Sequence, residues 1–467
     1  MKHLLLLLSL LAPPLLAQSR PNIVWVIAED MNGWFGCYGD STVPTPAIDQ
    51  LATQGLRFDR AYMTAGVCSA CRSALATGAM QTSLGIHHHR SSRQLVPGDA
   101  ITLPPGVKTI YQLMREAGYF VSTEGMNKND FNFLWKSTDL YDIDASAGPK
   151  NPKPARHLWR QRPDGKPFFA QIQLVGGKLP PKAIRSTPTD PASVKVMPYY
   201  PDIPEIRQTI AHHYDTIRQT DAQLAEIIAA LTQDGLLDNT YVFFWTDHGM
   251  ILYRHKQWVY DASIRVPLLF RGPGIKPGSQ RDDLVSGIDI TATTLALAGA
   301  PKPAWFEGLH LLAPDHTPRD FVFAARDRCD YTIDRVRSVT TRRFHYLRNF
   351  LTDRPFMQPQ YRDGQPFMEA PRALHKAGKL TPVQEFVWSE TRVPEEFYDL
   401  ENDPHETKNL IADPAFASEI ARHRQILSDW IQTTGDKGQQ PESPAGLRAV
   451  LKEWGPKAVN PEYTPLR

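Results

Sequence analysis

Two pairs of side chains that can bind a metal ion or move a proton stand more than two hundred residues apart in the chain. Glu29 and Asp30 directly follow an apolar run, NIVWVIA, while Asp247 and His248 follow a second run, YVFFW, after a single threonine. Continuous apolar, β-branched runs are typical of strands that are buried on both faces. Because α/β proteins bind ligands beyond the carboxyl ends of parallel strands, we expect both pairs to meet in one crevice.

The chemistry of these pairs favours a metal site. Three carboxylates in one crevice, those of Glu29, Asp30 and Asp247, would repel one another strongly unless a cation lay between them. Oxygen-rich ligation favours a hard ion such as calcium or magnesium over zinc. A single acidic pair more often caps a helix or faces solvent. Two pairs at the same end of two expected strands favour a metal site made of Glu29, Asp30, Asp247 and His248.

A cysteine stands in a segment rich in small residues, GVCSACRSALATG at 66–78. These residues suit a helix that begins near Ser69 and packs closely, which would place Cys68 at the positive helix end where anions bind. Three interpretations are open at this point. Cys68 could be a thiolate nucleophile, one half of a C-x-x-C redox pair with Cys71, or the precursor of another group.

The segment CSACR at 68–72 resembles the C-x-[P/A]-x-R signature of the type I sulfatases, which belong to the alkaline phosphatase-like superfamily. In that family the cysteine is oxidised to formylglycine before the protein is active. Together with further segments the resemblance spans nearly the whole mature chain in the expected order. These segments are PNIVWVIAEDMNGWFGCYGD at 21–40, Thr45–Tyr62, 246–274, Ser286–Gly299 and Glu396–Leu410.

The resemblance implies a role for each matched residue. The four residues of the two pairs would hold one Ca²⁺, and the hydrated formylglycine at position 68 would attack the sulfur of a sulfate ester. Arg72, one helical turn after Cys68, would steady the aldehyde hydrate by charge-assisted hydrogen bonds. Lys128 and Lys256 match two family lysines that neutralise aldehyde and sulfate oxygens.

The sequence departs from the family pattern at three positions. Glu29 stands where the family more often has aspartate, and Asp130 replaces a histidine that is a common sulfate contact. The strand that usually leads to the leaving-group histidine leads here to VGGK instead. Lys178 or His255 could supply the proton, and we favour Lys178 because it follows that strand directly.

A basic cluster, HHHR, follows the expected nucleophile helix at 87–90. It could form a substrate-facing loop for an anionic sugar or an ordinary surface loop. Adjacent residues point in different directions, so at most one or two of them can face a site. We take His87, His88 and Asp130 as candidate substrate contacts.

The composition and the N-terminus restrict the location and the partners. Charged residues make up 22% of the 467 residues and the formal net charge is +2, which argues against a nucleic-acid binder. Residues 1–17 read as a signal peptide cleaved near Ala17, rather than as a membrane anchor, because the apolar run is short and contains Pro13 and Pro14. No later stretch is apolar enough to span a membrane. We therefore expect a periplasmic or secreted protein.

The pattern of segments predicts an α/β protein. Apolar residues at helical spacing from Ile206 to Leu231 precede the YVFFW strand, and a helix followed by a buried strand is typical of a parallel sheet. We expect an alkaline phosphatase-like sandwich with a central mixed, mostly parallel sheet in a catalytic domain at 18–320. A smaller α+β C-terminal domain at 321–435 and an extended tail at 436–467 should follow.

The sequence thus predicts an exported sulfatase that acts on a sulfated polysaccharide or oligosaccharide, with Ca²⁺ and a formylglycine made from Cys68. Ala70 in place of proline is similar to motifs processed by oxygen-independent maturases, so a formylglycine-generating maturase is an expected partner. A phosphodiesterase or phosphonate hydrolase of the same superfamily is the closest alternative. A non-catalytic glycan-binding protein and a dithiol oxidoreductase that uses Cys68 and Cys71 are more distant ones.

Overall fold

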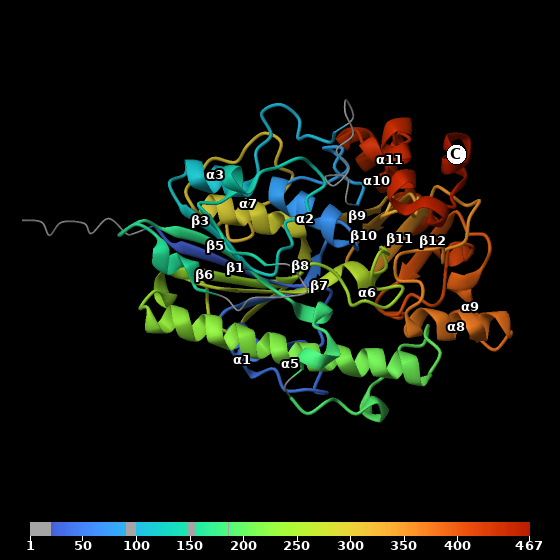
Figure 1. Cartoon of the computed structure of the whole chain (residues 1–467), viewed down its shortest axis with the longest axis horizontal. Helices are drawn as coiled ribbons and strands as arrows, with labels where there is room; N and C mark the ends of the chain where they lie inside the picture. The colour runs from blue at the N-terminus through green and yellow to red at the C-terminus, as the bar shows by residue number, and fades with distance from the viewer. Residues whose placement is uncertain (1–19, 90–99, 148–155, 185) are drawn as a thin grey trace, which may run out of the picture.

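A central sheet organises the larger part of the molecule (Figure 1). The computed structural model describes residues 20–89, 100–147, 156–184 and 186–467, so the expected signal peptide and its cleavage site near Ala17 lie outside the described residues. Within the described residues the sheet has eight strands in the order β4-β3-β5-β1-β6-β7-β2-β8. The strands are β1 (Asn22–Ala28), β2 (Leu56–Tyr62), β3 (Phe120–Gly125), β4 (Ile143–Asp144), β5 (Phe168–Leu174), β6 (Thr240–Thr246), β7 (Arg265–Arg271) and β8 (Ser279–Ser286).

The strand β1 lies at the centre of this sheet and is buried along its whole length. It pairs in parallel with β5 and β6, and Ala28 at its end lies opposite Leu174 and Thr246. The strand β7 runs antiparallel to both of its neighbours, β6 and β2. The expectation of a mixed, mostly parallel sheet is therefore confirmed.

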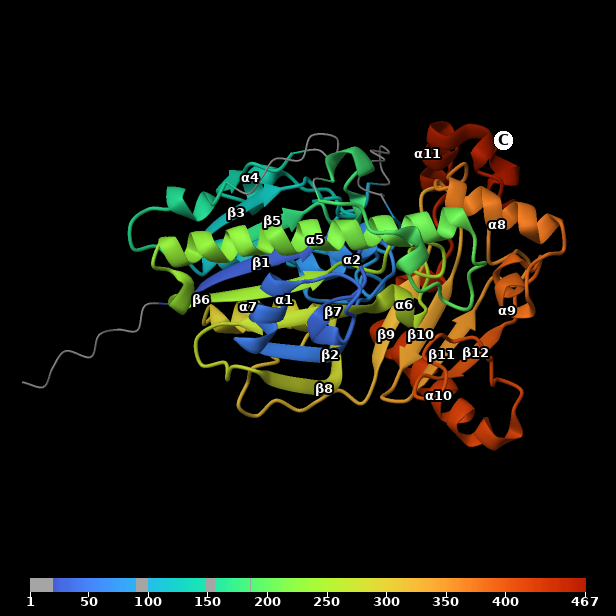
Figure 2. The same cartoon turned by 90° about the horizontal axis from the view of Figure 1, so that it is seen from below.

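Alternate side chains of β1 enter two apolar cores, one on each face of the sheet, because successive residues of a strand point to opposite sides. Val24 packs in the same core as Ile210, whereas Trp25 packs in the other core with Leu75. Figures 1 and 2 show helices over both faces, which makes the sandwich. The first face carries α1 (Pro46–Thr53) and α5 (Pro204–Gln233), and the second carries α2 (Cys68–Thr77), α3 (Ile110–Glu116) and α7 (Gly287–Leu297).

The 30-residue helix α5 confirms the helical spacing read from the sequence. Its apolar side packs on the sheet, and the chain turns away at Gly235, which has the left-handed φ of 67° that glycine adopts without strain. Its other side is polar. Among the residues that the structure describes, no helix is long and apolar enough to cross a membrane.

A second, smaller sheet forms the core of the C-terminal part, which confirms the expected α+β domain. Its four described strands are antiparallel, in the order β12-β11-β10-β9, and Val339 and Phe397 pack against Leu427 of α10. In Figure 2 this sheet lies beyond the carboxyl ends of β1 and β6. Its elements are β9 (Val322–Arg326), β10 (Val336–Thr340), β11 (Phe344–Asn349), α8 (Pro366–Lys376), α9 (Pro382–Glu385), β12 (Glu395–Asp399) and α10 (Ala417–Thr434).

The segment at 436–467 is not the extended strap that its proline, glycine and lysine content suggested. It contains the helix α11 (Pro444–Trp454), which packs against Tyr331 of the smaller domain. The Ser443 side chain accepts a backbone N–H of the first turn, and Pro444 occupies the first helical position, where its missing N–H costs nothing. The segment expected to be an extended tail therefore contains a helix that begins at a proline.

Candidate active site

The two predicted pairs meet at the carboxyl ends of neighbouring parallel strands. Glu29 and Asp30 follow β1, and Asp247 and His248 follow β6. The backbone N–H of Asp30 donates to Oδ1 of Asp247 at 2.9 Å, and all four side chains are at most 1% exposed. Asp30 has a φ of 45°, an uncommon conformation for a residue other than glycine. The prediction of one shared crevice is confirmed.

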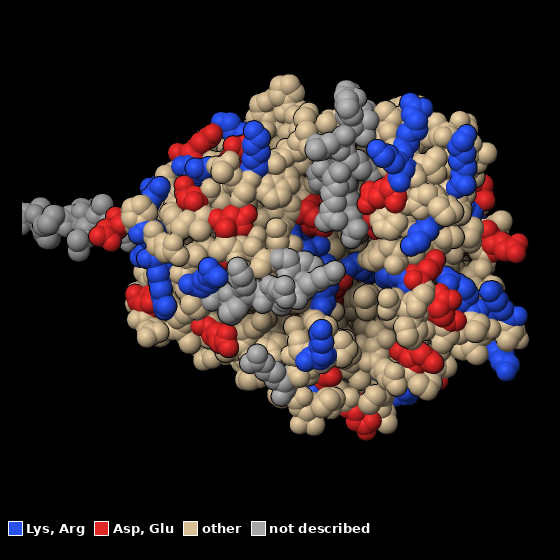
Figure 3. Space-filling view, in the orientation of Figure 1, with Lys and Arg blue, Asp and Glu red and all other residues tan. Residues whose placement is uncertain are grey.

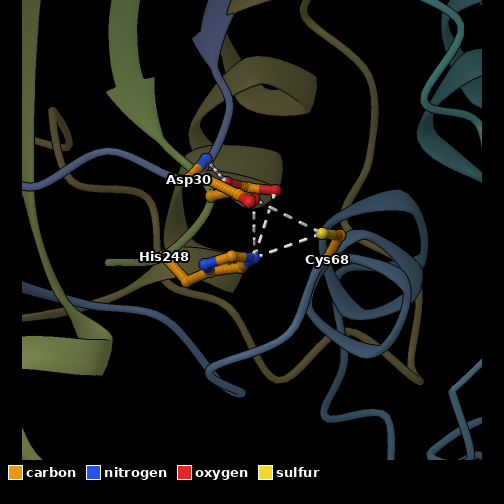
Figure 4. A group of neighbouring side chains, drawn as sticks. Asp30, Cys68 and His248 are labelled. Carbon is orange, nitrogen blue, oxygen red and sulfur yellow. Dashed lines mark hydrogen bonds and ion pairs between the residues drawn. The ribbon is translucent and has the colours of Figure 1, made fainter. Parts of the chain in front are cut away.

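Cys68 faces this crevice from the first position of α2, one residue before the expected helix start at Ser69. Its Sγ lies 3.2 Å from Nε2 of His248 and 3.7 Å from Oδ1 of Asp30, as Figure 4 shows. One ligand atom from each of Asp30, Cys68, Asp247 and His248 lies within 4.8 Å of the others. The helix N-terminus adds unpaired N–H groups that favour negative charge at residue 68.

Three lysines surround the Cys68 thiol. Burial by itself would raise the pKa of this thiol, but the lysine charges outweigh burial and lower the pKa. Nζ of Lys178 is 3.4 Å from Sγ, and Nζ of Lys256 pairs with Asp30. The site therefore stabilises an anion at position 68. The three lysines are Lys128, Lys178 and Lys256.

Two glycines allow Lys178 to reach the site. A Cβ on Gly176 would lie 2.3 Å from the carbonyl oxygen of Glu29, and one on Gly177 would lie 2.2 Å from that of Asp30. The chain after β5 therefore packs directly against the backbone of Glu29 and Asp30, and the N–H of Gly177 donates to the Glu29 carbonyl at 2.8 Å. Nζ of Lys178 pairs with the Glu29 carboxylate and lies 3.3 Å from Oδ1 of Asp30.

Arg72 fixes the positions of the Glu29 and Asp247 carboxylates. It lies one turn after Cys68 in α2, where it pairs with Glu29 and, at 3.3 Å, with Oδ2 of Asp247. Burial would lower the pKa of the guanidinium, but these two carboxylates raise it. It also donates to Oε1 of Gln173 at 2.7 Å. Gln173 is a site residue that the sequence reading missed, although a buried amide in the apolar strand FFAQIQL is a visible signal.

Both carboxylate oxygens of Glu29 have cationic partners. Oε1 pairs with Arg72, while Oε2 pairs with Lys178 and lies 3.5 Å from Nζ of Lys128. Glu29 thus borders the group of converging ligand atoms. Its role as a metal ligand stays a prediction.

The donor atoms at the centre fit a hard cation. Burial would raise the pKa of Asp247, but His248 and Arg72 lower it to about 2. Burial would lower the pKa of His248, but Asp247, Cys68 and Asp30 raise it to about 9. Asp247 is therefore ionised and can offer its oxygens to a cation. Sulfur is the one soft donor in the group, and an oxygen at position 68 would replace it with a donor that Ca²⁺ prefers.

Asp130 stands beside the lysines. Its Oδ2 lies 2.9 Å from Nζ of Lys128. Burial would raise the pKa of Asp130, but Lys128, Arg72 and Lys178 hold it far below its usual range. The carboxylate is therefore ionised, and its contact with substrate stays a prediction.

His255 lies at a separate cavity of about 290 Å³. Its Nδ1 contacts Oδ1 of Asn32 at 2.8 Å, and its Nε2 contacts the hydroxyl of Tyr199 at 2.9 Å. Burial holds the pKa of His255 well below its usual range, so the ring is neutral. A neutral ring with both nitrogens engaged is a poor proton donor, which favours Lys178. Asn32 is a second neighbour of the site that no motif marked.

His87 and His88 lie against the C-terminal segment. Their rings are in contact, and Nε2 of His88 is 3.9 Å from Oε2 of Glu442. Burial lowers the pKa of both rings. Arg90, the last residue of the basic cluster, lies outside the described residues. Whether either ring contacts a substrate stays a prediction.

Cys71 does not suit the redox interpretation. Its thiol is fully buried, and burial together with the charge of Asp247 raises its pKa well above the usual range. A resolving thiol needs access and thiolate character. No disulfide is present among the described cysteines, including Cys68 and Cys71.

The surface around the crevice carries positive charge. In Figure 3, Lys and Arg side chains gather around a hollow near the middle of the drawn face, between the large sheet and the smaller domain of Figure 1. Such a hollow attracts an anionic ligand.

Comparisons with known proteins agree with this geometry. A family model described as Sulfatase matches residues 21–300. The chain is 29% identical to an "Ulvan-active sulfatase" of Formosa agariphila, over 95% of this chain and 79% of that protein. It is 25% identical to the "N-sulphoglucosamine sulphohydrolase" of Homo sapiens, over 90% of this chain and 92% of that protein.

Solved structures share the fold. A protein in complex with its substrate D-glucosamine-2-N,6-O-disulfate has a TM-score of 0.64 at 16% identity, covering 90% of this chain and 100% of that one. A phosphonate monoester hydrolase from Silicibacter pomeroyi has the same TM-score at 17% identity, covering 90% and 97%. At these identities the likeness establishes an alkaline phosphatase-like fold and leaves the choice of substrate open.

Proposed function

The chain belongs to the sulfatase family, and we propose that it removes sulfate from a sulfated carbohydrate by means of a formylglycine made from Cys68 and a bound Ca²⁺. As a member of that family it is a sulfuric ester hydrolase. The observation that carries the proposal is the convergence of Asp30, Asp247 and His248 on Cys68 at the positive end of a helix.

Asp30, Asp247 and His248 would hold the Ca²⁺, with Glu29 as the fourth predicted ligand. When bound, the ion would polarise a sulfate ester and favour an ionised oxygen at position 68. The formylglycine would supply a hydrated aldehyde as nucleophile, and its second hydroxyl is what allows the sulfate to be expelled afterwards. The donor set supports this assignment, because conversion of Cys68 removes the only soft donor.

The lysines of the site would bind and orient the sulfate group. Four cationic side chains contact four carboxylates here, those of Glu29, Asp30, Asp130 and Asp247, so every lysine has an anionic partner before substrate binds. The ammonium groups of Lys128 and Lys256 would turn from the carboxylates to the sulfate oxygens, where they neutralise negative charge in the transition state. Arg72 would remain on Glu29 and Asp247 and keep them in position.

Lys178 would place a proton near the leaving oxygen. Burial would lower the pKa of Lys178, but Asp30, Cys68 and Glu29 raise it well above its usual range. Nζ is therefore protonated at neutral pH, 3.4 Å from the atom that becomes the nucleophile. We keep Lys178 as the predicted proton donor because it is protonated and lies in the crevice, whereas His255 lies at a separate cavity.

The substrate class follows from the relatives. The names of the aligned proteins mention ulvan and N-sulphoglucosamine, both carbohydrates. We therefore propose a sulfated polysaccharide or oligosaccharide as substrate, with His87, His88 and Asp130 as candidate contacts. A formylglycine-generating maturase would act on Cys68 before the enzyme is active.

We also propose that the chain is exported, with residues 1–17 removed near Ala17, to the periplasm or outside the cell. The catalytic domain would end near residue 320, in the stretch between α7 and β9. The smaller domain would extend to about residue 435, and the segment at 436–467 would be its C-terminal cover.

Parallel assays test the proposal. Enzyme produced together with a maturase should release inorganic sulfate from sulfated oligosaccharides and from a sulfate monoester. It should act much more slowly on a phosphodiester or a phosphonate monoester, and Cys68→Ala should abolish release. Preference for the phosphorus substrates would assign the protein to the hydrolases represented by the phosphonate monoester hydrolase instead.

A further inference from the structure

A second group of metal-ligating side chains lies between the two domains. His89 lies in the stretch that follows α2, whereas Cys329 and Asp330 follow β9 of the smaller domain. All three side chains are buried, with exposures of at most 3%. The backbone N–H of His89 donates to the carbonyl of Arg328 at 2.9 Å, which fixes the two segments side by side.

The ligand atoms converge on one point. Nδ1 of His89 lies 3.4 Å from Oδ1 of Asp330 and also 3.4 Å from Sγ of Cys329, and all three atoms lie within 4.8 Å of one another. Both distances are longer than ordinary charge-assisted hydrogen bonds, so neither contact is a strong hydrogen bond. Ligands of a tetrahedral zinc ion, at about 2.0–2.3 Å from the metal, would be separated by about 3.3–3.6 Å. The observed spacing therefore matches edges of a zinc coordination tetrahedron.

The surroundings favour a thiolate at Cys329. Nε2 of Gln257 donates to Sγ of Cys329 at 2.9 Å, while Arg362 donates to Oε1 of the same amide at 3.1 Å. The arginine thus fixes the orientation of the amide, with its N–H toward the sulfur. Metal sites typically contain hydrogen-bond donors that do not bind the metal themselves. Such a donor stabilises the charged form of a metal ligand.

A tight turn brings the two consecutive ligands together. Cys329 and Thr332 exchange both backbone hydrogen bonds at 2.9 Å, and a guanidinium N–H of Arg328 donates to the carbonyl of Asp330 at 2.6 Å. Asp330 has a φ of 50°, a conformation that costs free energy for a residue other than glycine. Such strain persists where the surrounding structure or a ligand compensates it.

We propose that His89, Cys329 and Asp330 bind a zinc-class divalent cation, at a site distinct from the Ca²⁺ site. The mixed nitrogen, sulfur and oxygen donors select a borderline metal, whereas the carboxylate-rich crevice selects a hard one. The ion would tie the stretch after α2 to the smaller domain.

Cobalt(II) binding tests the proposal, because a cobalt–thiolate bond gives a charge-transfer absorption band. The parent protein is full-length Cys68→Ala, which lacks the thiol of the catalytic crevice. It is treated first with a chelator and then with excess Ca²⁺, and it is then titrated with Co²⁺. One equivalent of Co²⁺ should bind with a thiolate band. The band should disappear when Cys329→Ala is added and persist when Cys37→Ala, at a half-buried cysteine elsewhere, is added instead.

Two further variants keep the test decisive if Cys329→Ala fails to fold by circular dichroism. His89→Gln and Asp330→Asn, each in the Cys68→Ala parent, should weaken Co²⁺ binding by more than about tenfold. Zn²⁺ should raise the melting temperature of the parent and leave that of these variants unchanged. Absence of a thiolate band in the parent, or a band that survives loss of Cys329 or of both other ligands, overturns the proposal.

Discussion

Buried charges are arranged differently at the carboxyl edge of the large sheet and inside the smaller domain. In the smaller domain Arg337 lies between Asp327 at 3.0 Å and Asp436, which accepts from two guanidinium nitrogens at 2.6 and 3.0 Å. At the sheet edge four carboxylates alternate with four cationic side chains, and the Cys68 thiol lies among them.

The difference separates a structural ion pair from a binding site. All three guanidinium nitrogens of Arg337 donate hydrogen bonds, to the two carboxylates and to backbone carbonyls, so the group offers no donor to a further ligand. The crevice has one left-handed aspartate, Asp30, and three lysines whose charges favour an anion at position 68, so its charges act on a reacting atom. Changes in the crevice should therefore affect catalysis, while changes at Arg337 should affect stability.

Cys68→Ala should have the largest effect, because it removes the nucleophile. We expect kcat to fall by on the order of 10⁶-fold, as for other lost nucleophiles. Cys71→Ser, one turn away in the same helix, is the matched control and should retain activity. Sulfate release and thermal melting measure both variants. Loss of activity in Cys71→Ser with Cys68→Ala still active would restore the redox interpretation.

Arg337→Met should lower the free energy of unfolding by about 3–5 kcal/mol, because it leaves two buried carboxylates without their cation. Arg342→Met is the matched control, since its pair with Asp282 is exposed on both sides and should contribute at most about 1 kcal/mol. Denaturant unfolding measures both. The folded fraction of Arg337→Met should keep the kcat of the parent, and a specific loss of kcat would break the proposed separation of roles.

Gly177→Ala should lower catalytic activity although it removes no charged group from the crevice. The added Cβ would lie 2.2 Å from the carbonyl oxygen of Asp30, so either the loop that contains Asp30 or the turn that contains Lys178 must shift. Because a displacement of about 1 Å can cost about 10²-fold in rate, we expect kcat/KM to fall by that order. Ca²⁺ affinity, measured by calorimetry, should fall as well. Unchanged kinetics would show that the close approach of the two loops is dispensable.

The free energy of unfolding should fall at acid pH as Glu442, in the C-terminal segment, becomes protonated. Burial would raise its pKa, but Arg328, which binds it in a bidentate pair, and His88 lower it to about 2. A lowered pKa means that the stabilisation is present above the unfolded pKa of about 4.5 and is lost as pH falls toward 2. The free energy difference between parent and Glu442→Gln should be on the order of 2 kcal/mol at pH 7 and should shrink across this window. A difference that does not depend on pH would contradict the assignment.

The sequence predicted the parts of the fold and site that carry strong local patterns. The runs that form β1 and β6 are buried on both faces, so their ends, and the pairs at 29–30 and 247–248, could be placed together. The strands β2 and β8 were not predicted, because LRFDRAY and SQRDDLVS contain charged residues that face solvent near the edge of the sheet. Their register depends on tertiary pairing.

Other site residues could not be found from local pattern. Gln173 and Asn32 act through several amide hydrogen bonds to groups far apart in the sequence, and local pattern does not show such contacts. The carboxylate partners of Arg72 come from both ends of the catalytic domain, so its contacts emerge only once the sheet is assembled. The helix α11 was missed because prolines at a helix start look the same in sequence as prolines in a loop.

The central claim concerns residue 68, and mass spectrometry of the tryptic peptide Ala61–Arg72 tests it most directly. The protein should be produced with and without an oxygen-independent sulfatase maturase, and the peptide should be treated with a hydrazide that labels aldehydes. Residue 68 should be an aldehyde in the protein made with the maturase, and sulfate release should be proportional to the converted fraction. A thiol at position 68 in fully active enzyme would contradict this claim.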